Sequence, residues 1–196
     1  MGLRVKFWFN EFLDWFDMNI LGLVGSPRNA SNTDLLVTRI LEGAAANKNS
    51  TEKVYLYPLE IKPCVDCKAC KKATFQCALK DDLTALYPKL EAADVVVFGT
   101  PLYWYGPSAK MKLLIDRLRP FIASKKLAGK KAVLVVPSEE GAEACNLTVG
   151  MYEMSCKYLE MDLVSVLLPK ASEKAEVKTQ PQTLNDAFEI GKKLTL

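Results

Sequence analysis

Histidine is absent from the 196 residues, which excludes imidazole acid–base catalysis and every metal site that needs a His ligand. No apolar run reaches the ~20 residues of a membrane helix without Gly or Pro interrupting it. A net charge of +3 is too small to demand nucleic acid or a membrane surface as a partner. The amino terminus does not resemble a signal peptide, because Glu11, Asp14 and Asp17 interrupt its apolar region. These absences predict a cytoplasmic globular protein.

Apolar runs of strand length alternate with helical patterns, which is typical of a parallel sheet with crossover helices. The predicted strands are Met18–Val24, Lys53–Tyr57, Asp94–Phe98, Lys131–Val136 and Leu163–Leu168. The third and fourth are almost continuously apolar, as interior strands are, whereas the second alternates with tyrosines and suits an edge. We therefore predict an α/β fold with a doubly wound five-stranded parallel sheet in the order 2-1-3-4-5. In that order the ligand lies beyond strands one and three.

Five helices are expected around this sheet, and their inward faces are predicted from apolar spacing. A last helix begins near Pro181, which suits a first helical turn. The residues that mark the other four inward faces are Leu36, Ile40 and Leu41; Leu83, Leu86, Tyr87 and Leu90; Met111, Leu114, Ile115 and Leu118; and Leu147, Met151, Tyr158 and Leu159.

The loop after the first predicted strand is rich in hydrogen-bond donors and precedes a helix. It runs from Gly25 to Thr33 and combines Arg28 with several hydroxyls and amides. The start of a helix offers free N–H groups and a positive dipole end, so this loop suits a phosphate. Helix capping alone would explain one of these residues. The loop lacks the lysine of a nucleoside-triphosphate P-loop and lacks G-x-G-x-x-G, so a monophosphate fits better.

The loop after the third predicted strand carries three consecutive aromatic residues, Tyr103, Trp104 and Tyr105. A flat ring system lying against this loop would explain aromatics at the mouth of the sheet. A satellite hydrophobic cluster or a subunit contact is the alternative, since aromatics are also enriched at interfaces.

Together these motifs resemble the NADPH-dependent FMN reductase family of flavodoxin-like proteins, from about Met18 to the end. The resemblance rests on Gly25–Arg28 with Ser31–Thr33, on Thr100–Trp104, and on Lys110–Lys112 through Asp116–Arg117. It implies FMN as cofactor, with the third contact, Ser138–Gly141, more acidic here than is usual. The implied FMN residues are, for the phosphate, Ser26, Arg28, Ser31, Asn32 and Thr33, and, for the flavin ring, Pro101, Leu102, Tyr103 and Trp104.

Four of the six cysteines form a compact motif of spacing C-x2-C-x2-C-x6-C, made of Cys64, Cys67, Cys70 and Cys77. Such a run favours a [4Fe–4S] cluster, because structural zinc sites more often pair two separated C-x-x-C knuckles. Zinc and unligated or redox-active thiols remain open. Within the resemblance, the motif marks the iron–sulfur flavoprotein branch, whose members carry a [4Fe–4S] cluster beside FMN. The lysines around it would offset a negative cluster or dock an acidic ferredoxin-like partner.

Residues 1–17 are expected to be an extension to the domain at 18–196, which has its cysteine-rich insertion at 61–80. Trp8, Phe12 and Trp15 share one face of a helical pattern there. A start codon assigned too far upstream is the first explanation. A short amphipathic helix that packs on a neighbouring subunit or a membrane surface is the second.

These patterns predict an FMN-dependent oxidoreductase in which a cluster passes single electrons to or from the flavin. The donor is expected to be a ferredoxin or NAD(P)H, and the acceptor a small molecule, with no nucleic acid or membrane as partner. One alternative is an NAD(P)H-dependent flavin or quinone reductase without a cluster, and another is a non-enzymatic electron carrier. The resemblance implies a homodimer or homotetramer.

Overall fold

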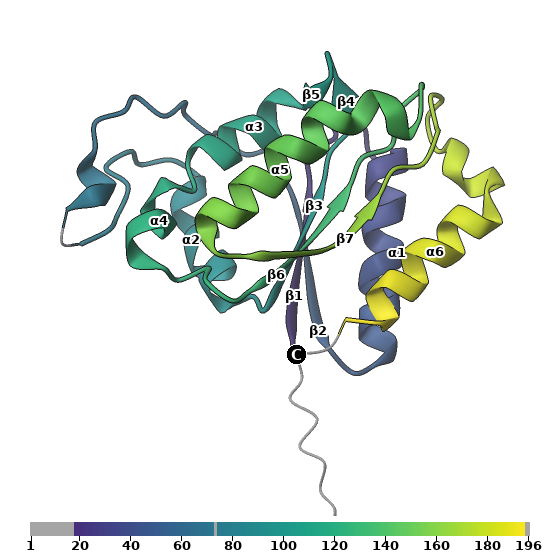
Figure 1. The fold of residues 1–196 in the computed structure, drawn as a ribbon, viewed down its shortest axis with the longest axis horizontal. Helices are drawn as coiled ribbons and strands as arrows, with labels where there is room; N and C mark the ends of the chain where they lie inside the picture. Colours follow the sequence, from purple (N-terminus) through teal and green to yellow (C-terminus); the bar gives the residue numbers. More distant parts are fainter. Residues whose placement is uncertain (1–17, 73, 195–196) are drawn as a thin grey trace, which may run out of the picture.

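Five parallel strands form the central sheet (Figure 1) of the computed structural model, which describes residues 18–72 and 74–194. The strands are β1 (Asn19–Val24), β2 (Ser50–Tyr55), β3 (Val95–Gly99), β6 (Lys131–Val135) and β7 (Asp162–Leu167). Their order is β2-β1-β3-β6-β7, and every neighbouring pair is parallel. The predicted doubly wound, flavodoxin-like fold with order 2-1-3-4-5 is confirmed.

Helices cover both faces of the sheet (Figure 1). On one face lie α1 (Asn32–Ala46) and α6 (Pro181–Lys192), and on the other α2 (Leu83–Ala92), α3 (Ala109–Asp116), α4 (Arg119–Ser124) and α5 (Asn146–Leu159). Side chains of a strand alternate between the faces, so Val95 and Val97 pack toward α1, while Val96 and Phe98 join the core under α2, α3 and α5. All five residues of β3 are buried, which explains its continuous apolar sequence.

Helices α1 and α6 approach so closely that glycine is required on both. A Cβ atom at Gly43 would lie 2.0 Å from the carbonyl oxygen of Phe188. At Gly191 it would lie 1.8 Å from the carbonyl oxygen of Ile40. Real Cβ atoms do not come this near to backbone, so the two helices are locked side by side at this point.

Several short elements were not predicted from the sequence. A two-stranded hairpin, β4 (Leu102–Tyr103) with β5 (Gly106–Pro107), follows β3. Its two turn residues, Trp104 and Tyr105, have φ angles of 49° and 60°, the left-handed conformation that a two-residue hairpin turn requires. The 3₁₀ turns are η1 (Ala69–Lys71), η2 (Ala142–Cys145) and η3 (Glu176–Thr179).

Two expectations about the elements are wrong in detail. Strand β2 begins at Ser50, three residues before the predicted Lys53, because an edge strand tolerates the exposed polar residues that open it. On α5, Leu147 and Tyr158 were expected to face the core but are 73% and 66% exposed. The buried face of α5 consists instead of Thr148, Tyr152, Cys156 and Leu159.

The predicted extension at 1–17, with Trp8, Phe12 and Trp15, lies outside the described residues. The division into 1–17 and 18–196 therefore stays a prediction. Across 18–72 and 74–194, no helix combines the length and the hydrophobicity needed to cross a membrane.

Candidate functional site

A cleft of about 340 Å³ lies where the parallel strands end, at the edge expected to bind a ligand in a doubly wound sheet. Its walls are the loops that follow β1, β3, β6 and β7. The volume is within the range of small-molecule and cofactor pockets. The cleft brings together most of the residues expected to bind FMN: Ser26, Arg28, Ser31, Asn32, Thr33, Pro101, Leu102 and Tyr103.

The loop after β1 is shaped to present N–H groups at the start of α1. Ser31 caps the helix, its Oγ accepting from the N–H of Asp34 at 3.1 Å. Ser26 Oγ accepts from the N–H of Arg28 at 3.2 Å, which leaves its own O–H free to donate. Arg28 is exposed at the mouth of the cleft, so its guanidinium can reach a bound anion. This wall is therefore positive and rich in donors.

Asp34 places a carboxylate beside this loop, where it would oppose an anionic ligand if it had no partners. Its Oδ2 accepts from the N–H of Ala30 at 3.0 Å, and its Oδ1 lies 2.8 Å from both Lys53 Nζ and Tyr55 OH. Burial would raise the pKa of Asp34, but the hydrogen bonds from Lys53 and Tyr55 hold it below its ordinary value. The carboxylate is thus ionised, neutralised by Lys53 and used to hold the turn at Ala30 in place.

Ser108 joins the first two walls, a role that the sequence did not reveal. It is buried at the start of α3, and its Oγ donates to the carbonyl of Gly25 at 2.5 Å. Its backbone N–H donates to Thr100 Oγ1 at 2.9 Å. The loop after β3 is thereby fixed against the loop after β1.

Trp104 is not brought to the cleft with the other expected residues. It stands at the tip of the β4–β5 hairpin with 97% of its side chain exposed, and it does not line the cleft. Tyr103 lies at the base of the same hairpin and does line it. The difference follows from the turn, because a two-residue hairpin turns its central side chains away from the strands.

The cleft has two further walls, and the sequence did not predict that they lie together. The loop after β6 contributes Ser138 and Glu139, and the loop after β7 contributes Ser172 and Lys174. Asn32 fixes the last loop: its Nδ2 donates to the carbonyl of Glu173 at 2.8 Å, and its Oδ1 accepts from the N–H of Val177 at 3.2 Å. In the sequence, Lys174 follows the last predicted strand among small residues, and this could have indicated that the loop lines the cleft.

The four motif cysteines line one small cavity of about 20 Å³, together with Arg117 and Arg119. Cys70 is buried and Cys67 is exposed, so the cavity has an inner wall on the fold and an outer wall toward solvent. Among the described residues, no three Cys, Asp or Glu side chains are placed to hold a single metal ion. The volume suits about one water molecule. A [4Fe–4S] cluster therefore requires the outer wall to move outward, while the sulfur donors and the basic surroundings have the right chemistry.

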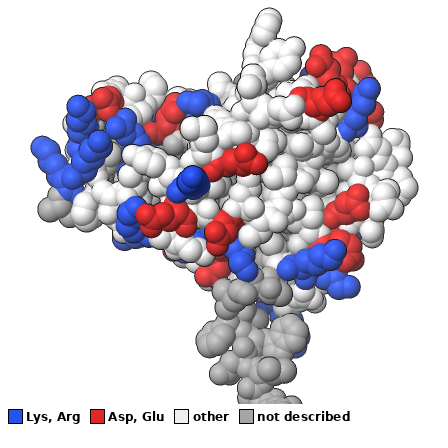
Figure 2. All heavy atoms as spheres, in the orientation of Figure 1, with Lys and Arg blue, Asp and Glu red and all other residues white. Residues whose placement is uncertain are grey.

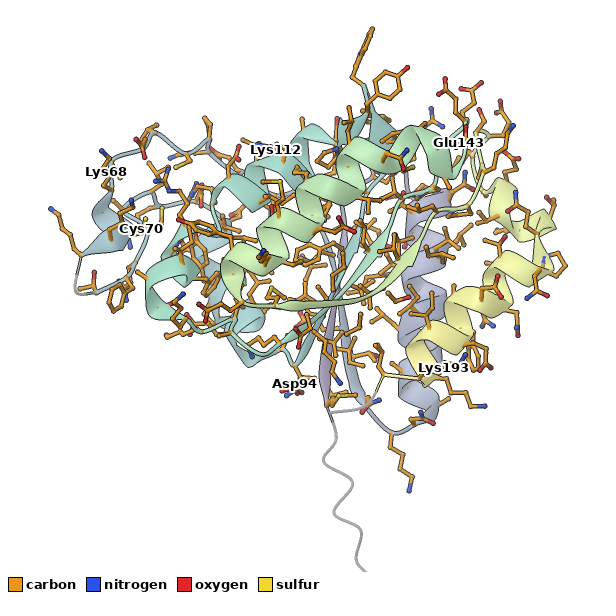
Figure 3. The ribbon with its side chains drawn as sticks, viewed as in Figure 1. Lys68, Cys70, Asp94, Lys112, Glu143 and Lys193 are labelled. Carbon is orange, nitrogen blue, oxygen red and sulfur yellow. The ribbon has the colours of Figure 1, made fainter. Side chains whose placement is uncertain are left out.

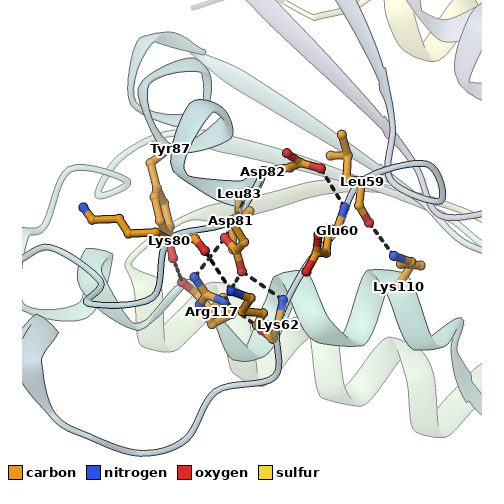
Figure 4. Close-up of polar contacts among 10 residues, drawn as sticks. All are labelled: Leu59, Glu60, Lys62, Lys80, Asp81, Asp82, Leu83, Tyr87, Lys110 and Arg117. Carbon is orange, nitrogen blue, oxygen red and sulfur yellow. Dashed lines mark hydrogen bonds and ion pairs between the residues drawn. The ribbon is translucent and has the colours of Figure 1, made fainter.

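The stem of the cysteine loop is closed by a buried ion pair (Figure 4). Arg117 and Asp81 are 1% and 0% exposed, and Arg117 Nη1 and Nη2 lie 2.8 and 3.3 Å from the carboxylate oxygens. Lys62, at the other end of the loop, donates its N–H to Asp81 at 2.9 Å and accepts from Arg117 Nη1 at 2.7 Å. Burial would raise the pKa of Asp81, but hydrogen bonds from Arg117 and from the Lys62 N–H keep it below its ordinary value.

Basic side chains gather at the end of the molecule that carries this loop (Figure 2). Lys68 and Cys70 are labelled there in Figure 3, at the opposite end of the molecule from Glu143 in η2. Arg119, paired with Asp66 at 2.7 Å, adds a cation on the cavity wall. Burial raises the pKa of Cys70, and the nearby charge of Arg119 opposes that rise. Burial therefore outweighs the field of Arg119, and the Cys70 thiol without a metal stays neutral.

The family model for NADPH-dependent FMN reductases matches residues 18–173, which include the cysteine loop and every residue that lines the cleft except Lys174. The chain belongs to the NADPH-dependent FMN reductase family. An iron-sulfur flavoprotein of Archaeoglobus fulgidus is 32% identical over 151 residues, which are 75% of this chain and 74% of that one. The predicted resemblance to this family and to iron–sulfur flavoproteins is confirmed.

Other relatives extend the comparison. Iron-sulfur flavoprotein MJ1083 of Methanocaldococcus jannaschii is 37% identical over 64% of this chain. The match spans 66% of the length of MJ1083. The match to the iron-sulfur flavoprotein of Methanosarcina thermophila spans 52% of that protein's length. YwqN of Bacillus subtilis, named a putative NAD(P)H-dependent FMN-containing oxidoreductase, is 22% identical over 90% of this chain and 98% of its own.

Solved structures agree on the fold. The Trp repressor binding protein from Bacillus subtilis superposes with a TM-score of 0.66 at 21% identity, over 88% of this chain and 98% of that one. The NAD(P)H:quinone oxidoreductase from Methanothermobacter marburgensis also superposes with a TM-score of 0.66, at 16% identity, over 90% of this chain and 96% of that one. At these identities the likeness is one of fold alone.

Proposed function

We propose that this protein is an FMN-dependent oxidoreductase that binds FMN in the four-walled cleft. The observation that carries the proposal is the juxtaposition of the donor-rich start of α1 with the loop after β3 across one cleft. A monophosphate fits the first wall and a flat ring fits the second, so the two ends of a single ligand are accounted for. Membership in the FMN reductase family supports the same assignment.

In this proposal each wall has a separate task. Ser26, Arg28, Ser31 and Thr33, with the free N–H groups of α1, hold the phosphate, while Asn32 keeps the wall after β7 in position. The ring would lie against Pro101, Leu102 and Tyr103, which line the cleft, whereas Trp104 does not line it. Bound FMN would supply hydride and single-electron chemistry. The protein residues bind and orient the group, which agrees with a chain that has no histidine.

We assign Cys64, Cys67, Cys70 and Cys77 to a [4Fe–4S] cluster. Their shared cavity supports the assignment, as do relatives named iron-sulfur flavoproteins. The cluster would serve as a one-electron relay between an external donor and FMN. If the four cysteines bind zinc or stay free thiols, only the FMN chemistry remains of the proposed function.

The partners in this proposal are NAD(P)H or a ferredoxin as donor, a small molecule as acceptor, and further copies of this chain in a homodimer or homotetramer. Exposed apolar side chains on α5 support self-association: Leu147, Met154 and Tyr158 are 73%, 75% and 66% exposed. None of the six cysteines forms a disulfide, which agrees with the reducing, cytoplasmic location that we propose.

Anaerobic purification followed by an absorption spectrum and assays for FMN, iron and zinc tests both cofactors. We expect one FMN and about four irons per chain, following Cys₄ ligation. Absence of FMN from protein incubated with the cofactor would refute the proposal.

Turnover assays then separate the donors. YwqN, named for NAD(P)H dependence, favours a second candidate function, an NAD(P)H-dependent reductase that needs no cluster. Iron-free protein that oxidises NAD(P)H as fast as iron-loaded protein does would favour this second function. Reduction by ferredoxin that depends on iron content would favour the cluster as relay.

A further inference from the structure

Arg117 carries a buried hydrogen-bond donor that nothing in the described structure accepts. Its Nε belongs to a small set of buried side-chain atoms without a partner among the described residues, the others being Ser124 Oγ and Tyr152 OH. Of these three residues, only Arg117 lines the cysteine cavity. An unpaired buried donor costs about 1–3 kcal/mol, so native proteins seldom leave one without an acceptor.

The other edge of the guanidinium is fully used. Nη1 and Nη2 bind the two oxygens of Asp81, and Nη1 also donates to the carbonyl of Lys62. This contact fixes the plane of the group and leaves the Nε–H edge as the free one. Because the side chain is 1% exposed, bulk solvent does not reach this edge.

The same group shares its cavity with the sulfur ligands, since Arg117 and all four motif cysteines line it. Burial disfavours the charge of Arg117, but its hydrogen bonds to Asp81 hold its pKa above its ordinary value. The cavity thus holds a fixed cation, with an unused donor, beside the cysteines of the motif.

We propose that Arg117 Nε donates a hydrogen bond to a cysteine sulfur of the cluster and raises the reduction potential of the cluster. The inference rests on the proposed [4Fe–4S] assignment. An electron added to the cluster makes the site more negative, and a buried cation with a hydrogen bond to sulfur stabilises that extra charge. Arg117 thereby has two tasks, since it closes the stem of the loop and sets how readily the cluster accepts an electron.

Arg119 provides a matched comparison. It also lines the cysteine cavity and pairs with a loop aspartate, Asp66, but its side chain is 33% exposed and that of Asp66 is 61% exposed. Solvent and salt screen a charge in that position, so its influence on the cluster is weaker. Replacing each arginine by lysine keeps the charge and removes the Nε–H, which isolates the donor that the proposal invokes.

The experiment is a potentiometric titration of anaerobically reconstituted protein, with the cluster followed by its electron paramagnetic resonance and FMN by its absorption. We expect Arg117→Lys to shift the cluster potential to more negative values and to leave the FMN potential unchanged. Arg119→Lys should give a smaller shift. An iron-loaded Arg117→Lys variant with an unchanged cluster potential overturns the proposal, whereas a wild-type protein that binds FMN but no iron overturns the cluster assignment itself.

A measurement on the unaltered chain covers the case in which Arg117→Lys does not fold. In protein labelled with ¹⁵N-arginine, electron–nuclear double resonance of the reduced cluster should show a ¹⁵N coupling and an exchangeable proton that disappears in D₂O. The Arg119→Lys protein should keep both signals. Absence of the ¹⁵N coupling from iron-loaded wild-type protein overturns the hydrogen bond.

Discussion

The cleft and the cysteine loop are held in different ways. Three of the four walls of the cleft are joined by polar contacts, Ser108 to Gly25 and Asn32 to the segment at 173–177. The cysteine loop is fixed at its stem by Arg117 and Asp81, while its outer arc is largely exposed. The cleft is therefore complete without a ligand, whereas the cavity between the cysteines is too small for the cluster it is proposed to hold.

The comparison shows which site depends on its ligand. Loops that leave the ends of buried strands share the rigidity of the sheet, so the cleft should keep its shape in cluster-free protein. The arc between the stem residues has few buried apolar side chains and should become ordered when metal is bound. The following changes test this difference, from the largest expected effect to the smallest.

Cys67→Ala should abolish the broad visible absorption of the cluster and leave bound FMN at wild-type stoichiometry, because one of four sulfur ligands is lost and the cleft is untouched. Iron and FMN assays measure the two outcomes. Cys156→Ala is the control, because this buried cysteine lies on α5 and does not line the cavity of the motif cysteines. Loss of FMN together with the cluster would show that the two sites are not independent.

Asp81→Asn should destabilise the protein by about 3–5 kcal/mol, since it leaves the buried guanidinium of Arg117 without its counter-charge. Urea unfolding at pH 7 measures the change. Asp66→Asn, which removes the exposed partner of Arg119, should cost less than about 1 kcal/mol. Equal effects from the two variants would contradict the assignment of the stem as the anchor of the loop.

The stem also predicts a pH dependence. The pKa of Asp81 in the folded protein lies below its ordinary value of 3.8. Its contribution to the free energy of unfolding is therefore present above pH 3.8 and is lost as the pH falls through the pKa of the folded protein. The stability difference between wild type and Asp81→Asn should therefore shrink in acid. A difference that stays constant down to pH 2 would mean that the carboxylate charge is not the source of the stabilisation.

Arg28→Ala should weaken FMN binding by about 1.5–3 kcal/mol, the usual scale of a charge-assisted hydrogen bond. Fluorescence titration of apoprotein with FMN measures the affinity. Arg39→Ala is the matched control, because this arginine lies on α1 and pairs with Glu42 away from the cleft. Unchanged affinity in Arg28→Ala would place the phosphate elsewhere.

Asp34→Asn should lower stability by about 1 kcal/mol, less than Asp81→Asn, because its partner Lys53 is partly exposed and can be solvated. Its lowered pKa gives the same sign of pH dependence, with stabilisation lost as the pH falls through the folded value. Thermal unfolding at several pH values measures it. A larger loss than in Asp81→Asn would reverse the comparison between the two regions.

Removal of residues 1–17 should leave FMN content and folding unchanged, because the whole sheet and every wall of the cleft lie downstream. Absorption spectra and unfolding curves of the truncated and full chains measure the effect. Loss of soluble protein would show that the segment takes part in the core or in assembly.

Strong buried patterns in the sequence predicted the sheet, because β1, β3 and β6 are covered on both faces and show it in their apolar runs. The sequence did not predict the parts of the structure whose signals are weak or local. The hairpin strands of two residues each have no periodicity to detect, and the stem of the cysteine loop joins Lys62, Asp81 and Arg117 across distances that spacing does not reveal. The position of Trp104 depends on a turn conformation that aromatic residues rarely adopt.

The glycine contact between α1 and α6 has a consequence for how a ligand enters and leaves. It locks α6 to the second half of α1, and Asn32 ties the first turn of α1 to the segment that precedes α6. The wall after β1 and the wall after β7 therefore belong to one rigid body. Relative motion of these two walls is therefore not the route by which a bound molecule enters or leaves.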